Sequence, residues 1–195
     1  MGIRSRAPGR VSRGLLALTL GLSVCTAFAA DIAGVRLDDK VSAGNRELVL
    51  NGAGVRSRAI FKVYVAGLYL PGKTADVATV LAAPARRVEL HLLRKLGSDQ
   101  LLDALNEGLR ANNGESDLLS LKSEVDQLAA IMRGMKDVKE GDVVVIDFAD
   151  GATHVLLNGD TKGSIPGAGF NRALMKVWLG EHPVQSDLKK AMLGG

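Results

Sequence analysis

Apolar residues along the chain repeat with two different periods, and each period predicts a different kind of element. Residues 59–70 are rich in β-branched and aromatic side chains, which favour a strand. Both alternating faces of this segment are largely apolar, so we expect a central strand that is covered on both sides. An earlier strand is expected at 46–51, with a turn or bulge at 51–54, where glycines supply positive φ. Further strands are expected at 87–93, 143–148 and 153–157.

Other segments carry apolar residues three and four positions apart, which is the spacing of one helix face. Leucines that recur every four residues from Leu101 predict a helix with Ser98 as its N-cap and its end at 112–114. A longer apolar stripe over 118–135 predicts a second, core-facing helix. Shorter helices are expected at 76–81, at 170–179 and from Ser186 onward. The order of strands, helices, a hairpin and further helices predicts an α+β fold with one antiparallel sheet covered by helices.

Charge is distributed unevenly along the 195 residues, whose formal net charge is +4. The first 29 residues contain four arginines and no acid, so the remaining chain is neutral. A neutral body offers no basic stripe for phosphates, which supply most of the affinity for nucleic acid. We therefore expect no nucleic-acid partner.

Residues 1–29 have the pattern of a secretory signal peptide: a basic stretch, an apolar stretch, and Ala27 and Ala29 at cleavage spacing. We expect cleavage before Ala30, one domain at 30–195, and export to the periplasm of a Gram-negative bacterium, with no stable membrane span after cleavage. An uncleaved anchor is one alternative. Lipidation of Cys25, the only cysteine, is another. A mature chain without cysteine has no disulfide and no thiol chemistry.

Motifs of catalytic sites are missing from the sequence. It has no G-x-S-x-G elbow, no phosphate loop, no H-E-x-x-H zinc pair and no G-x-G-x-x-G turn. The three histidines, His91, His154 and His182, are far apart in the chain. We interpret His91 as an outward-facing strand residue and His182 as a loop residue. The alternative is a metal or acid/base site built on the histidines. We expect no metal and no cofactor.

The stretch from Asn51 to Pro71, NGAGVRSRAIFKVYVAGLYLP, resembles the signature of the chalcone isomerase-like family. In that signature a glycine turn and Gly-Val-Arg lead into a long strand of the form Lys-Val-Tyr-x-x-Gly-Leu-Tyr-Leu. The segment from Gly163 to Lys190 is similar to the closing part of bacterial members, and the likeness extends over essentially all of 30–195. The resemblance implies an open-faced β-sandwich, an antiparallel sheet covered by a layer of helices.

In the plant isomerases of this family, a substrate phenolate attacks an enone and closes a flavanone ring. The resemblance implies that Arg56 matches the arginine that pairs with the anionic substrate oxygen. The family's strand threonine falls on Tyr64, and its helix tyrosine and asparagine fall on Leu101 and Gly108. These departures remove polar groups that would stabilise the developing enolate, so we expect no chalcone cyclisation.

The fatty-acid-binding relatives resemble the chain better, because they use an arginine followed by a tyrosine in the long strand at a carboxylate. Arg56, Ile60 and Tyr64 share one face if that strand is unbroken, and a guanidinium holds a carboxylate through two parallel hydrogen bonds. The structural alternatives are that Arg56 pairs with an internal acid or caps backbone carbonyls, and that Tyr64 packs in the core.

Three functions follow for the exported protein. The first is non-catalytic binding of a fatty acid or similar apolar carboxylate in a cleft between sheet and helices, with Arg56 as anion anchor and Tyr64 as hydroxyl donor. The second is an isomerase of the intramolecular lyase type with another substrate. The third is a structural or partner-binding role in the envelope. The stripe that includes Met132 and Met135 is interpreted as core packing in preference to a ligand surface.

Overall fold

A computed structural model describes Gly2 and residues 30–195. The expected signal peptide and the possible lipidation of Cys25 lie outside the described residues, so they stay predictions.

Seven of the strands form one antiparallel sheet in the order β3-β4-β5-β6-β7-β8-β9, so each strand pairs with its neighbour in the chain. Strands β1 and β2 form a separate hairpin. The strand bounds are β1 Ala30–Ile32, β2 Val35–Leu37, β3 Lys40–Ala43, β4 Arg46–Arg58, β5 Phe61–Leu70, β6 Arg86–Leu92, β7 Val143–Ala149, β8 Ala152–Leu157 and β9 Asp160–Pro166.

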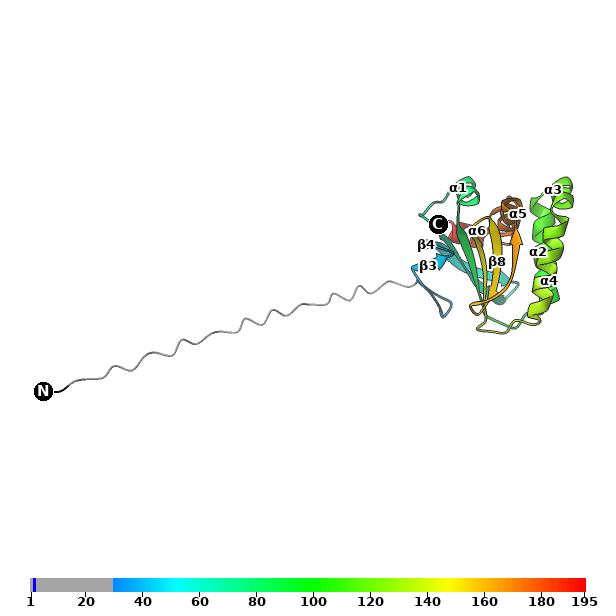
Figure 1. Ribbon diagram of the computed structural model, residues 1–195. Coiled ribbons are helices and arrows are strands. Elements are labelled where there is room, and N and C mark those ends of the chain that lie inside the picture. The colour runs from blue at the N-terminus through cyan, green and yellow to red at the C-terminus, as the bar shows by residue number, and fades with distance from the viewer. Residues whose placement is uncertain (1, 3–29) are drawn as a thin grey trace.

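The helices gather on one face of this sheet, where α2, α4 and α5 form a layer (Figure 1). The helix bounds are α1 Val77–Ala82, α2 Ser98–Asn112, α3 Glu115–Ser120, α4 Lys122–Met135, α5 Ala168–Leu179 and α6 Ser186–Met192. The predicted α+β class, with one antiparallel sheet covered by helices, is confirmed.

The main correction concerns the first half of the sheet. The sequence predicts a turn or bulge at 51–54 and one unbroken strand over 59–70. The structure has the bulge alternative at 51–54, as a register shift between Leu50 and Gly52, and β4 continues through it. The unbroken strand is wrong, because the chain turns at Ala59 and Ile60. Strands β4 and β5 therefore form a long hairpin. The expectation that β5 is central holds, because it lies between β4 and β6 and is buried from Tyr64 onward.

Smaller differences have local causes. The apolar stripe over 118–135 is divided at Leu121, whose backbone leaves the helical region and separates α3 from α4. Gly97 occupies the N-cap of α2, so Ser98 is the first helical residue, and the backbone N–H of Gly97 donates to the Gln100 side chain at 3.2 Å. Strand β9 was not predicted, because its exposed, glycine-interrupted sequence lacks an apolar alternation.

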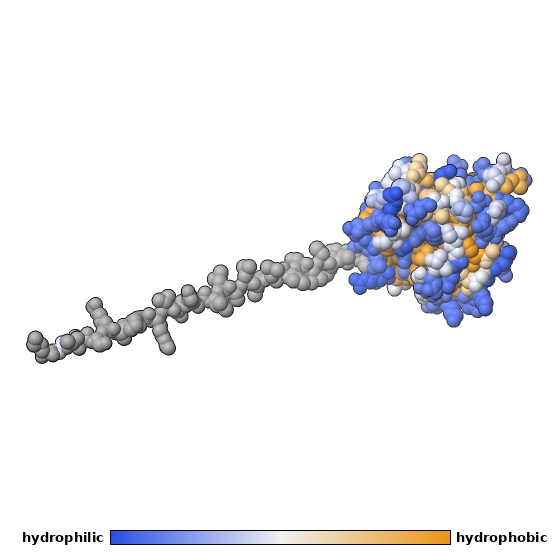
Figure 2. Space-filling view, in the orientation of Figure 1, coloured by the Kyte–Doolittle hydropathy of each residue, from blue (hydrophilic) through white to orange (hydrophobic). Residues whose placement is uncertain are grey.

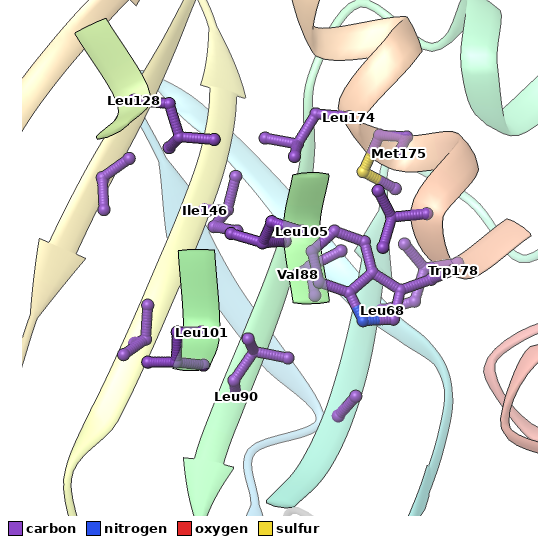
Figure 3. Close-up of a cluster of buried hydrophobic side chains, with 14 of the residues drawn as sticks. Leu68, Val88, Leu90, Leu101, Leu105, Leu128, Ile146, Leu174, Met175 and Trp178 are labelled. Atoms are coloured by element: carbon purple, nitrogen blue, oxygen red, sulfur yellow. The ribbon is translucent and has the colours of Figure 1, made fainter. Parts of the chain in front are cut away.

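The main core lies between the sheet and the helix layer. In Figure 3, Leu101 and Leu105 of α2 lie over Leu90 and Ile146 of the sheet, with Trp178 of α5 beside them. A second, smaller apolar cluster occupies the other face of the sheet and is made of Ala43, Leu48, Tyr69 and Ala85.

Outside the core, the face seen in Figure 2 is mostly hydrophilic, with hydrophobic residues in small patches. Within the part of the chain that the structure describes, no helix has the length and apolarity that crossing a bilayer requires.

Candidate functional site

A cavity of about 590 Å³ lies between the sheet and the helices, within the range of about 300–1,000 Å³ that small-molecule sites occupy. Its walls are apolar and come from several elements. They include Leu90 of β6, Ile146 of β7, Leu101 and Leu105 of α2, and Trp178 of α5, all of them buried.

One end of this cavity has a charged, exposed rim. The lining there includes Arg58 at the end of β4, Phe61 at the start of β5, and Arg94 and Lys95 just after β6. Four lining residues are cations and a single one, Glu107, is an acid. The cavity therefore combines an apolar interior with a positive opening, which suits a molecule that has an apolar body and an anionic head.

Arg56 and Tyr64 both line this cavity. They are direct cross-strand partners in the β4–β5 register, because the chain turns between them. Side chains of directly opposite residues lie on the same face of a sheet. The sequence analysis also predicted that they share one face, but it assumed that both lie on a single unbroken strand. Ile60, which was expected to share that face, lies at the hairpin tip with 89% of its surface exposed and does not line the cavity.

The Tyr64 hydroxyl is buried and accepts a hydrogen bond from Nε1 of Trp178 at 3.1 Å. Burial raises the pKa of Tyr64, and the hydrogen bonds and charge of Trp178 and Arg56 offset only part of that rise. The phenol therefore stays protonated at neutral pH. Because both neighbours are donors, the hydroxyl oxygen is an acceptor here, and its own proton is free to be donated to a third group.

The Arg56 guanidinium is half-buried and is positioned by Gln185, in the loop before α6. The Gln185 Oε1 atom accepts from Nη1 of Arg56 at 3.3 Å and from the backbone N–H of Ser57 at 2.8 Å. The Gln185 Nε2 atom donates to the Val55 carbonyl at 3.2 Å. Nη1 of Arg56 also donates to the Ser57 carbonyl. Among the described residues no carboxylate pairs with Arg56, so its charge is not neutralised internally.

These contacts show that Arg56 and Tyr64 each have structural contacts and also line the cavity. Arg56 caps a backbone carbonyl and also faces the cavity, and Tyr64 belongs to the buried core as well as to the cavity lining. The ligand-binding roles stay predictions.

The two positions where the resemblance places catalytic groups behave differently. Leu101 lines the cavity with an apolar side chain. Gly108 is buried against α5, and a Cβ atom there would lie 2.7 Å from Cγ1 of Val177. A larger residue at Gly108 would push α2 and α5 apart, so the glycine is required by the helix contact.

The remaining candidates do not converge. His91 lies on the sheet face away from the helices, with Nε2 3.1 Å from Oε1 of Glu89, while His182 lies in the exposed loop after α5. Within residues 30–195 no group of three His, Cys, Asp or Glu side chains is placed to hold a metal ion. Met132 and Met135 are both buried in the core, and Met132 in addition lines the cavity.

Sequence reasoning missed Trp178 and Gln185 as members of the site. Trp178 was interpreted only as an apolar position of its helix. The chain contains one tryptophan, and a buried indole N–H normally has a hydrogen-bond acceptor, which is the signal that could have drawn attention to it. For Gln185 no comparable local signal exists, because its contacts lie about 130 residues away in the chain.

Comparison with known proteins agrees with this architecture. A model of the chalcone isomerase-like family matches residues 29–194. A crystal structure of a fatty-acid binding protein from Arabidopsis thaliana is similar with a TM-score of 0.65 and 15% sequence identity, covering 82% of this chain and 92% of that one. No curated protein sequence is significantly similar to the chain. Because the family model matches nearly every described residue and the solved structure has the same arrangement of sheet and helices, the protein belongs to the chalcone isomerase-like family and has its fold.

Proposed function

We propose that the protein binds a fatty acid or a similar apolar carboxylate without transforming it. The tail would occupy the cavity between sheet and helices, and the carboxylate would lie between Arg56 and Tyr64. The structural likeness to a fatty-acid binding protein supports this choice of ligand class.

One observation carries the proposal: hydrogen-bond donors meet at the cavity and lack an acceptor. Arg56 brings a guanidinium with no carboxylate partner in the described chain, and Tyr64 brings a hydroxyl proton that neither neighbour can accept. A carboxylate accepts from both, and charge-assisted hydrogen bonds of this kind are stronger than neutral ones. The apolar walls supply the rest of the affinity, at about 0.8 kcal/mol for each methylene group removed from water.

Binding is favoured over catalysis because the cavity lacks the groups that an enolate needs. Leu101 offers no hydroxyl. Val177 occupies the space beside Gly108, so no side-chain amide fits there unless a helix moves. We expect negligible formation of flavanone from chalcone in an absorbance assay. Saturable cyclisation that disappears in Arg56→Ala would replace the binding proposal with an isomerase.

Export is the second part of the proposal. The match to the family begins at residue 29 and β1 begins at Ala30, which supports a domain that starts where the signal peptide is expected to end. N-terminal sequencing of protein from a periplasmic fraction tests this, with Ala30 expected as the first residue. A chain that starts at Met1 in the cytosol would contradict it.

The ligand is tested by mass spectrometry of the organic extract from purified 30–195 protein, where we expect co-purified fatty acids. Titration with a long-chain fatty acid then gives the affinity. Trp178 is the single tryptophan of the chain and lines the cavity, so its fluorescence reports directly on occupancy. Arg46→Ala is a matched control, because Arg46 is exposed at the other end of β4 from Arg56. Equal affinity of wild type and a folded Arg56→Ala variant would overturn the carboxylate anchor.

A further inference from the structure

The tip of the β4–β5 hairpin exposes two large apolar side chains. Ile60 is 89% exposed and Phe61 is 55% exposed. Within the described residues, the one other large apolar side chain with comparable exposure is Leu119 on α3, at 68%. Two such residues are thus adjacent at one tip, beside the charged rim of the cavity.

The turn itself is unlike the other hairpin turns of the described chain. Those turns consist of Ala33-Gly34, Gly44-Asn45, Asp150-Gly151 and Asn158-Gly159, and each has a glycine at a positive φ. The β4–β5 turn has no glycine, and Ala59 takes a φ of 53°, the same value as Ala33 in the β1–β2 turn. What sets this turn apart is its second position, which is a large apolar residue, Ile60, with an exposed side chain.

Cations surround these apolar side chains. Arg58 and Lys62 flank the turn in sequence, and the Arg94 guanidinium lies 4.9 Å from the centre of the Phe61 ring. None of these three cations has an ion pair with an acid in the part of the chain that is described. The neighbouring Lys95 is paired with Asp137 at 2.7 Å. The tip therefore combines apolar side chains at its apex with a collar of uncompensated positive charge.

We propose that this tip docks the protein on an anionic lipid surface, with Ile60 and Phe61 in the interface and the collar of Arg58, Lys62 and Arg94 against lipid headgroups. Apolar side chains with adjacent cations are what binding to an anionic membrane surface requires, and each Lys or Arg near such a surface strengthens binding by about fivefold. An acidic protein partner would match the charges, but it would not require exposed apolar side chains at the apex.

The position of the tip relates docking to the cavity. Arg58, Phe61 and Arg94 belong both to the docking tip and to the cavity rim. A docked molecule would therefore hold the cavity opening against the membrane, where a fatty acid can pass between bilayer and cavity. This transfer step rests on the proposed function, whereas docking itself does not.

Docking is tested by co-sedimentation of 30–195 protein with vesicles of phosphatidylglycerol and phosphatidylcholine, compared with vesicles of phosphatidylcholine alone. We expect binding to the anionic vesicles, weakened by salt. Ile60→Asp should reduce partitioning by about tenfold or more. Aspartate suits a turn, so the variant should fold. Leu119→Asp is the matched control and should bind vesicles as wild type does, because Leu119 is far from the cavity rim. The cavity is lined by Gln100 at the N-terminal end of α2, whereas α3, which carries Leu119, follows the C-terminal end of α2.

Charge reversal tests the collar separately. Lys62→Glu should reduce partitioning into anionic vesicles by roughly tenfold, while Lys73→Glu, at the opposite end of the same hairpin, should have little effect. Equal sedimentation of wild type and Ile60→Asp, or equal losses in Ile60→Asp and Leu119→Asp, would overturn docking by the tip. So would a dimer in sedimentation velocity that Ile60→Asp abolishes, together with no vesicle binding by wild type.

The two proposals fail separately. Ile60 does not line the cavity, so Ile60→Asp should bind fatty acid in solution as wild type does, measured by Trp178 fluorescence. If the protein docks on vesicles but binds no fatty acid, the docking proposal stands and the proposed function is rejected. If it binds fatty acid but does not dock on vesicles, the proposed function stands and the docking proposal is rejected.

Discussion

Two arginines on the helix-covered face of the sheet have opposite surroundings. Arg86, where β6 begins, is 1% exposed and lies over the Phe148 ring at 4.4 Å, with Nη1 donating to the Ala83 carbonyl at 2.6 Å. Burial, together with the charge of Arg172, lowers its pKa to about 10. Arg56, at the other end of the sheet, is half-buried and opens onto the cavity.

The difference shows how the same side chain serves either the fold or a ligand. Arg86 is enclosed by an aromatic ring and a carbonyl, its Nε and Nη2 atoms have no hydrogen-bond partner among the described residues, and it does not line the cavity. Arg56 is held on one side by Gln185 and faces open space on the other. Substitutions at the first arginine should therefore change stability, and substitutions at the second should change affinity.

The largest effect is expected for Arg86→Ala. Removing this large buried side chain leaves a void against Phe148, so the free energy of unfolding should fall by about 2–4 kcal/mol in urea denaturation. Fatty-acid affinity of the folded variant should not change. Arg86→Met fills most of the volume and removes the desolvated charge, so it should stay within about 1 kcal/mol of wild type. Lost affinity with unchanged stability would place Arg86 in the binding site instead.

Arg56→Ala should have the reverse profile. Loss of a charge-assisted hydrogen bond of about 1.5–3 kcal/mol lowers fatty-acid affinity by about ten- to a hundredfold. The free energy of unfolding should change by less than about 1 kcal/mol, because the side chain is only half-buried. Fluorescence titration and urea denaturation of the same preparation separate the two effects.

Gln185→Glu sharpens the contrast by adding an internal competitor. The substitution is nearly isosteric and places a carboxylate beside Nη1 of Arg56, where the Gln185 oxygen now lies at 3.3 Å. The new carboxylate would neutralise the Arg56 guanidinium, which has no carboxylate partner among the described residues of the native protein. Fatty-acid affinity should therefore fall by about tenfold. Gln127→Glu, exposed on α4, is the control. Unchanged affinity in Gln185→Glu would show that Arg56 does not face the ligand's charge.

The smallest effect is expected at the two tyrosines of the chain, which lie on opposite faces of β5. Tyr64→Phe removes one neutral donor and should cost about 0.5–1.5 kcal/mol of binding free energy. Tyr69 is buried on the other face and its hydroxyl has no partner among the described groups, so Tyr69→Phe should leave affinity unchanged and stability equal or higher. A larger loss of affinity in Tyr69→Phe than in Tyr64→Phe would contradict the assignment of the cavity face.

Much of this arrangement could be predicted from local patterns. The leucine spacing after Ser98 predicted α2, and the doubly apolar segment before Pro71 predicted a central strand, because both signals depend on which side chains face the core. The break at Leu121 and strand β9 could not be predicted, since no turn residue marks the first and no apolar alternation marks the second.

The sequence by itself determined the fold class and the central strand and indicated Arg56 and Tyr64 as candidate site residues, because periodicity and the motif around these two residues are local properties. Only the tertiary structure decided that the chain reverses at Ala59 and Ile60, where no glycine or polar residue marks a turn and pairing of β4 with β5 imposes it. That reversal makes Arg56 and Tyr64 cross-strand partners. It also places the exposed tip beside the cavity opening, and packing of α5 then brings Trp178 to Tyr64 across 114 residues of chain, a distance that no local pattern spans.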